Sequence, residues 1–378
     1  MNCKTVLLKD LVLGEKGSYG IGAPAVDYDP KKYTYLRITD INDDGSINTN
    51  GLKSVDAEDA YKYVLQENDI VFARTGASTG KTYFYQPQDG TLVYAGFLIK
   101  FSIDPQKVNP RLLKYITHSQ EYYNWVRSFD TGGTRGNINA VTFANMPITL
   151  PDRATQDKIV AILSSLDDKI ELNRRINANL EQQAQALYKS WFVDNKKDDW
   201  EEKRLDDIIS IYDSQRKPLS GQQREKMEKL YPYYGAASLM DYVDNYLFDG
   251  IYLLLGEDGT VSDSEGFPML QYVWGKFWVN NHAHILQGKN GFTTESLYIL
   301  LKQTNVSSIV TGAVQPKISQ ANLKSVPITM PPINLLNQYN NIIKPIFNQI
   351  RINHNQIQQL STLRDTLLPK LMSGEIKV

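Results

Sequence analysis

Two stretches of the chain carry apolar residues at alternating steps of four and three, which is the pattern of a helix in a coiled coil. The first seam spans 33 residues and runs through Ile159, Leu163, Leu166, Ile170, Asn173, Asn177, Leu180, Ala184, Leu187 and Trp191. The second runs through Tyr339, Ile343, Ile346, Ile350, Asn353, Ile357, Leu360, Arg364, Leu367 and Leu371. The pattern predicts two long helices that pack on each other. The alternative is two helices that each cover only their own domain.

Two asparagines interrupt the apolar seams at equivalent positions. Asn173 and Asn353 each lie near the middle of a predicted helix. A buried asparagine in such a seam fixes the register of a coiled coil at some cost in stability. We expect these two side chains to form a hydrogen bond with each other, which either direction of pairing would allow. The connectivity of the chain favours antiparallel packing.

The two helices belong to an internal duplication. The segments that start at Thr131 and Thr311 share 12 identities over 62 gapless positions, at an offset of 180. Chance alone would give about four. The same offset matches Pro147 with Pro327, Ile148 with Ile328, Thr149 with Thr329, Asp69 with Asp249, and Gly76 with Gly256. The rest of the sequence has diverged, so a duplicated protein has kept one region and varied another.

The predicted helices alternate with two mixed segments. We divide the chain into residues 1–151, 152–195, 196–330 and 331–378, in which the second and fourth segments are the long helices. Each mixed segment combines short strand-like runs with helical stretches and frequent Asp-Gly or Asn-Gly turns. One helix is expected from Pro110 to Phe129. The predicted fold class is α+β: two globular domains, an antiparallel coiled coil and a pseudo-twofold duplication.

Composition narrows the class of protein. The 378 residues are 42% hydrophobic and 22% charged, as in ordinary globular proteins, and the net charge is −1. No apolar run reaches the roughly 20 residues of a membrane span, and the N-terminus has no signal-peptide core. The single cysteine, Cys3, excludes an internal disulfide. We expect a cytoplasmic protein without membrane contact. Its charge argues against a free-standing DNA-binding protein, although one basic face is enough for binding.

One loop has an incomplete phosphate-binding motif. Gly76–Thr82 has three residues between its glycines, whereas the phosphate-binding loop needs four. The shorter spacing would misdirect the backbone N–H groups that hold a phosphate. We interpret the segment as a turn with exposed donors.

Acidic and histidine pairs do not form a metal site by their spacing. Asp152 and Asp167 imitate a nuclease pair but would lie about 22 Å apart along one straight helix. His282 and His284 can share one face of a strand, but zinc needs further ligands and the chain has only four histidines. We therefore expect no catalytic site, no bound metal and no cofactor of the chain's own.

Several stretches of the chain, together with the order of the segments, have counterparts in a known family. They are residues 146–151 leading into 159–192, the ending 367–376, and residues 233–236, 256–260 and 275–278. In these stretches the chain resembles the specificity subunits of Type I restriction–modification systems. The resemblance implies that each mixed domain is a target recognition domain reading one half of a bipartite site in double-stranded DNA. It also implies that the coiled coil spaces these domains and docks methylation subunits, two in number, which bring S-adenosylmethionine. Restriction subunits would bring ATP-driven translocation and cleavage.

Polar residues near the repeated loops are candidates for contact with DNA. Arginine and lysine suit guanine or phosphate, while asparagine and glutamine suit adenine. The candidates are Arg74, Lys81, Arg135, Asn137, Lys276, Gln315 and Lys317. For each of them an exposed, solvated side chain is an equally good interpretation. Two other functions stay open: a coiled-coil adaptor joining two protein- or ligand-binding domains, and a nucleotide hydrolase that uses the Gly76–Thr82 loop.

Overall fold

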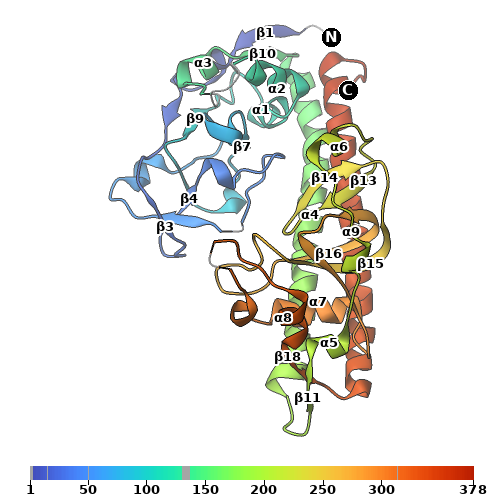
Figure 1. Cartoon of the computed structure of the whole chain (residues 1–378). Helices are drawn as coiled ribbons and strands as arrows, with labels where there is room; N and C mark the ends of the chain where they lie inside the picture. Colours follow the sequence, from blue (N-terminus) through green and yellow to red (C-terminus); the bar gives the residue numbers. More distant parts are fainter. Residues whose placement is uncertain (1–2, 15, 50, 130–136, 313) are drawn as a thin grey trace. The chain divides into compact units, whose positions relative to one another are not determined.

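The chain forms two compact units. The structure is a computed structural model that describes residues 3–14, 16–49, 51–129, 137–312 and 314–378 (Figure 1). One unit consists of Met1–Glu171 with Ile357–Val378, and the other of Leu172–Gln356. Each unit therefore contains one mixed domain and part of both long helices. No helix in the described ranges is long and apolar enough to cross a membrane.

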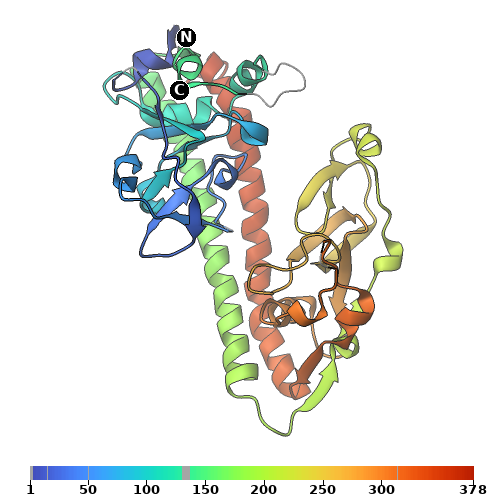
Figure 2. The same cartoon turned by 60° about the vertical axis from the view of Figure 1, so that its left-hand side comes forward.

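The two long helices are α4 (Arg153–Tyr188) and α9 (Ile333–Ser373), which pack side by side (Figure 2). In the first unit, Asp167 of α4 pairs with Arg364 of α9. In the second unit, the hydroxyl of Tyr339 donates to the carbonyl oxygen of Ala184 at 2.9 Å. Positions further along α4 thus meet positions earlier in α9, so the helices are antiparallel. The predicted coiled coil is confirmed.

The asparagines of the seam are both buried but do not bond to each other. Asn173 Nδ2 donates to Gln356 at 3.1 Å, and Asn353 Nδ2 donates to Asn177 at 2.9 Å. The antiparallel stagger places Asn353 opposite Asn177, one helical turn from Asn173. The expected direct Asn173–Asn353 hydrogen bond is therefore wrong. Asn173 Oδ1 is buried without a hydrogen-bond partner.

The first domain contains two four-stranded sheets and one two-stranded pair. One sheet has the order β2-β9-β6-β7, with bounds Ser18–Tyr19, Leu98–Ser102, Asp69–Ala73 and Thr82–Phe84. The other has the order β3-β5-β4-β8, with bounds Ala25–Asp27, Lys53–Val55, Tyr33–Leu36 and Leu92–Tyr94. Strand β1 (Lys4–Leu7) pairs antiparallel with β10 (Pro147–Leu150). The apolar core beneath β6 and β9 includes Ile159 and Leu163 of α4 and Leu371 of α9, so the domain is anchored to the helices by burial.

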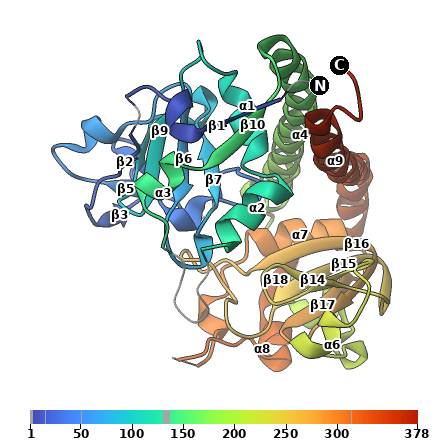
Figure 3. The same ribbon diagram turned by 90° about the horizontal axis from the view of Figure 1, so that it is seen from above.

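Two helices replace the single helix expected over residues 110–129. They are α1 (Pro110–Ile116) and α2 (Gln120–Arg127), and a short α3 (Ala140–Ala144) follows. Ser119 Oγ accepts a hydrogen bond from the backbone N–H of Tyr122 and so caps the start of α2, while α1 ends before it at the C-cap residue Thr117. Helix α1 contacts β7 on one side and α4 on the other, through Lys114 and Tyr115 (Figure 3).

The second domain is built on one six-stranded sheet with the order β12-β17-β15-β16-β13-β14. The bounds in that order are Ile209–Ile211, Ala283–Gly288, Phe248–Gly256, Leu270–Val279, Tyr231–Tyr234 and Leu239–Val243. Its short helices are α5 (Leu205–Ile208), α6 (Gly221–Glu225), α7 (Thr294–Lys302) and α8 (Gln320–Ser325). Strand β11 (Glu201–Arg204) pairs antiparallel with β18 (Pro327–Met330), as β1 pairs with β10 in the first domain. Ala184 and Tyr188 of α4 join this domain's core.

Candidate nucleic-acid interface

Two of the candidate residues, Arg74 and Asn137, meet in the first domain. Arg74 directly follows β6, and its guanidinium lies 5.0 Å from the centre of the Tyr19 ring. Arg74 Nε and Nη2 lie 3.4 and 3.3 Å from Asn137 Oδ1, which makes two long hydrogen bonds. The backbone N–H of Ile138 donates to the carbonyl oxygen of Arg74 at 2.9 Å. These contacts hold the loop before α3 against the end of β6.

Two exposed aromatic residues complete this site, and the sequence analysis missed both. The backbone N–H of Arg74 donates to the carbonyl oxygen of Phe97, whose side chain is 59% exposed. The Tyr19 hydroxyl accepts a hydrogen bond from the backbone N–H of Ala140. We call the cluster of Tyr19, Arg74, Phe97 and Asn137 the first corner. Its residues lie far apart in sequence, and only the pairing of the strands brings them together.

The other candidates of the first domain are not part of this corner. Lys81 Nζ lies 2.8 Å from Asp43 Oδ1 and donates to the carbonyl oxygen of Ile41 at 3.3 Å. Its charge is therefore already paired within the domain. Arg135 lies outside the described residues.

The same backbone frame occurs in the second domain. Ile318 N–H donates to the carbonyl oxygen of Glu257 at 2.9 Å, as Ile138 donates to Arg74. Glu257 N–H donates to the carbonyl oxygen of His282, as Arg74 donates to Phe97. The corresponding residues are Arg74 with Glu257, Phe97 with His282, and Asn137 with Lys317. We call Glu257, Asp258, His282 and Lys317 the second corner.

This correspondence changes the upstream alignment of the repeat. Ala73 pairs with Leu98 in the first sheet, and Gly256 pairs with Ala283 in the second. Gly256 therefore corresponds to Ala73, and the sequence match of Gly76 with Gly256 is wrong. The second copy has three fewer residues between the strand end and the repeated loop, so the offset of 180 does not extend upstream.

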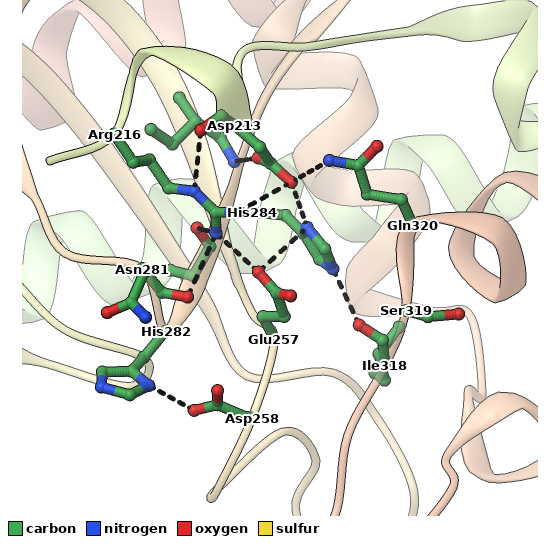
Figure 4. A network of polar contacts seen from close by, with 12 residues as sticks. Asp213, Arg216, Glu257, Asp258, Asn281, His282, His284, Ile318, Ser319 and Gln320 are labelled. Carbon is green, nitrogen blue, oxygen red and sulfur yellow. Dashed lines mark hydrogen bonds and ion pairs between the residues drawn. The ribbon is translucent and has the colours of Figure 1, made fainter. Parts of the chain in front are cut away.

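A network of buried charges supports the second corner (Figure 4). Arg216 Nη1 lies 2.6 Å from Glu257 Oε2, and Lys317 Nζ lies 3.4 Å from Glu257 Oε1. Asp213 Oδ2 lies 2.6 Å from His284 Nδ1 and accepts from Gln320 Nε2 at 2.5 Å. Burial alone would raise the pKa of Asp213, but the hydrogen bond and charge of His284 hold it below its ordinary value. The network links the sheet to the loop that carries Lys317.

The same network shows why these residues do not fit a metal ion. Asp213, Glu257 and His284 are close enough to share one. However, the Arg216 guanidinium bonds to Glu257 and lies 3.5 Å from Asp213, so it supplies the positive charge. Both ring nitrogens of His284 face acceptors, Asp213 and the carbonyl oxygen of Ile318.

The acidic pair near α4 has two separate structural roles. Asp152 accepts a hydrogen bond from the Thr155 N–H at the start of the helix. Asp167 instead pairs with Lys114 and Arg364. The two carboxylates therefore have different partners in the described residues.

Thr311 is bonded to Lys317 of the second corner. The two residues exchange two backbone hydrogen bonds of 2.8 and 2.7 Å. Gly312 adopts φ +89°, and a side chain there would collide with the carbonyl oxygen of Gln315. Val314 is fully exposed and Gln315 is exposed.

Lys276 lies at a different place on the second domain. Its Nζ lies 4.6 Å from the centre of the Tyr246 ring, and the hydrogen bond to Tyr246 raises the pKa of Lys276. In the antiparallel ladder of β15 and β16, Lys276 lies opposite Asp249, which is eight residues before Glu257 in the sequence. At about 3.3 Å per residue this is roughly 26 Å along the strand. The structure therefore brings Lys317 to the second corner but not Lys276.

Comparison with known proteins identifies the family. The Type I restriction modification DNA specificity domain matches residues 2–182 and again residues 197–362. The chain belongs to this family. The two matches correspond to the two halves of the duplication.

Individual relatives agree with this assignment. A putative type I restriction enzyme specificity subunit from Haemophilus influenzae is 35% identical over 133 residues, which are 35% of this chain and 34% of that protein. The aligned region therefore covers about a third of the length of that relative. The MjaIX specificity subunit from Methanocaldococcus jannaschii is 28% identical over 304 residues, or 70% of this chain and 69% of the relative.

A solved structure supports the fold. The S subunit of a Type I restriction–modification system from M. genitalium matches with a TM-score of 0.52 and 18% identity, covering 98% of this chain and 96% of that one. At this identity the likeness concerns the fold alone. The predicted architecture of two mixed domains and a coiled coil is confirmed.

Proposed function

We propose that this protein is the DNA-recognition subunit of a Type I restriction–modification complex. Each mixed domain reads one half of a bipartite site in double-stranded DNA, and the antiparallel helices set the distance between the halves. Methylation subunits, two per chain, dock on the scaffold and supply S-adenosylmethionine and the methyl transfer. Restriction subunits join the complex where the system contains them. The protein works in the cytoplasm, and it performs no chemistry of its own.

One observation carries this proposal: an identical backbone frame presents unlike side chains in the two copies. The hydrogen bonds of Ile138 and Ile318 build the same crossing in each domain. The first corner presents Arg74 and Asn137, whereas the second presents His282 and Lys317. A protein that reads two unlike half-sites needs a common frame for docking and different side chains for base contact.

The two alternative functions have less support. A nucleotide hydrolase would need Lys81 free to reach a phosphate, but Lys81 is paired with Asp43. An adaptor that joins unrelated ligands would not need the two domains to retain one backbone frame. The family assignment also favours DNA recognition over both.

The proposal is tested by selecting bound duplexes from a randomised pool with the full chain, purified alone and together with co-expressed methylation subunits. We expect a consensus of two short blocks separated by a spacer of fixed length. Selected duplexes that share no consensus would contradict sequence-specific DNA recognition. Methyl transfer or cleavage by the rigorously purified chain alone would contradict a purely recognition role.

A further inference from the structure

We propose that the two corners contain the base-reading residues, with Arg74 contacting a guanine in the half-site of the first domain and Lys317 contacting a base in the half-site of the second. This inference rests on the proposed function. It adds the position on each domain that determines which bases are read.

The geometry of Arg74 suits the edge of a guanine. Tyr19 lies against one face of the guanidinium, and Asn137 accepts from Nε and Nη2. Within the described residues, Nη1 has no hydrogen-bond partner. An arginine held in this way loses little side-chain freedom on binding, and its planar fork matches the O6 and N7 atoms of guanine.

The surroundings of Arg74 also favour contact with bases over contact with water alone. Phe97 is 59% exposed. Its carbonyl oxygen accepts a hydrogen bond from the backbone N–H of Arg74, so the two residues lie next to each other. A nucleic-acid surface that Arg74 contacts would cover Phe97, and contact with a thymine methyl group is one way to do so.

In the second corner, ion pairs orient the donor group, which is the Lys317 ammonium. Lys317 Nζ is held by Glu257, and Glu257 is held in turn by Arg216. The Lys317 side chain is 50% exposed, so its ammonium group can still reach a ligand. His282 is 47% exposed and is held by Asp258 at 2.5 Å. We assign Glu257 and Arg216 as positioning residues, because they act through Lys317.

The two other lysine candidates do not share these properties. Lys81 is 30% exposed, against 50% for Lys317, and it donates to the carbonyl oxygen of Ile41 as well as pairing with Asp43. Lys276 lies roughly 26 Å along the strand from Glu257. The corners are therefore the places where an oriented donor, an exposed surface and the duplicated frame coincide.

The test compares the consensus sequences selected by the full chain and by five variants, in complex with the methylation subunits. Arg74→Gln and Lys317→Gln remove the proposed contacts. Lys53→Gln and Lys203→Gln remove one charge each from the same domains, at residues that pair with Asp27 and Glu201. Arg74→Lys retains the charge but loses the planar fork. Circular dichroism and thermal melting confirm that each variant is folded.

We expect Arg74→Gln to lose its preference for guanine at one position of one half-site, by roughly 5- to 150-fold, with the other half-site unchanged. Lys317→Gln should change only the other half-site. The two control variants should keep the wild-type consensus. Arg74→Lys should show an intermediate preference at the same position.

Two results would overturn the inference. If Arg74→Gln and Lys317→Gln bind all sequences more weakly but select the unchanged consensus, both residues contact the phosphate backbone and do not read bases. If either variant changes both half-sites, the corners are not independent readers. A wild-type chain that selects no consensus would instead refute the proposed function itself, so the two failures are distinguishable.

Discussion

Asp167 of α4 forms an ion pair with Arg364 of α9, with 2.9 Å between Asp167 Oδ1 and Arg364 Nη1. The side chains are 14% and 17% exposed, so both charges are largely withdrawn from water. Lys114 Nζ lies 2.6 Å from the same carboxylate, and the Tyr115 hydroxyl donates to it at 3.0 Å. This carboxylate therefore joins both long helices to α1 of the first domain.

We predict that Asp167→Asn destabilises the first unit. The substitution removes the carboxylate that Lys114 and Arg364 share, and it leaves Arg364 with only the more exposed Asp365. Breaking a largely buried ion pair in this way typically costs about 3–5 kcal/mol. Urea unfolding of the full chain should show a transition of the first unit at a lower midpoint. Asp168→Asn is the matched control, because the neighbouring side chain is exposed. Equal stability of the two variants would contradict a structural role for the Asp167 cluster.

We also predict that acid destabilises the protein through two carboxylates. Burial raises the pKa of Asp167, but Lys114 and Arg364 outweigh it and lower the pKa below its ordinary value. The pKa of Asp213 is lowered in the same direction. As the pH falls, these two carboxylates are therefore protonated in the unfolded chain before they are protonated in the folded one. The stabilisation that they provide above pH about 4 is lost as the pH falls further.

Urea midpoints measured between pH 5 and pH 3 test this acid dependence. The wild type should lose stability steeply below pH about 4. Asp167→Asn should be less stable throughout but should show a shallower fall with pH. A slope unaffected by this substitution would show that other groups cause the acid sensitivity.

The two seam asparagines should respond differently to replacement. Asn173→Leu removes a buried Oδ1 that has no partner, and it releases only the exposed Gln356. We expect the free energy of unfolding to rise by about 1 kcal/mol. Asn353→Leu instead leaves the half-buried Asn177 without its donor, so the gain should be absent or reversed. Thermal melting of the two single variants and the wild type makes this comparison. An equal shift of the melting temperature in both variants would show that the hydrogen bonds of the two asparagines contribute equally to stability.

The helices could be predicted from the sequence because their signal is local and periodic. Ile159, Leu163 and Ile343 follow the seam pattern, and all three are buried. The partners of Asn173 and Asn353 could not be predicted, because the stagger of an antiparallel pair depends on how the domains pack against the helix ends. The break near Ser119 lies within the polar run 117–121, between the apolar residues of α1 and those of α2, and there the serine cap is a weak signal.

The candidate site was predictable only in part, for a related reason. Asn137 and Lys317 were found because they follow the repeated Thr-Gly loops, and Arg74 was found because it lies beside the Gly76–Thr82 loop. Tyr19 and Phe97 lie at strand ends far from those loops, and no local pattern distinguishes an exposed aromatic residue from a core one. The support of Lys317 by Arg216 and Glu257 likewise depends on the pairing of β12, β15 and β17.

The last prediction concerns the distance between half-sites. The core of the first domain includes Ile159 and Leu163 of α4, and the core of the second includes Ala184 and Tyr188 of the same helix. If the helix between these two cores sets the distance between the half-sites, a seven-residue insertion in α4 and a matching insertion in α9 should increase that distance. Seven residues add about 10.5 Å of helix and keep the seam in phase. The selected spacer should then grow by about three base pairs, at 3.4 Å per pair.

Four-residue insertions at the same two places provide the comparison for this experiment. They add only about 6 Å and rotate the following residues by about 40° beyond a full turn, which takes the apolar positions out of the seam. We expect weakened binding to every spacer length, since the helix pair itself is disturbed. Selection from a duplex pool with spacers of variable length gives both outcomes in one measurement. A coiled coil that sets the distance between the half-sites cannot be lengthened without moving one half-site away from the other. If the variant with seven-residue insertions still selects the original spacer at full affinity, some other part of the complex therefore sets that distance.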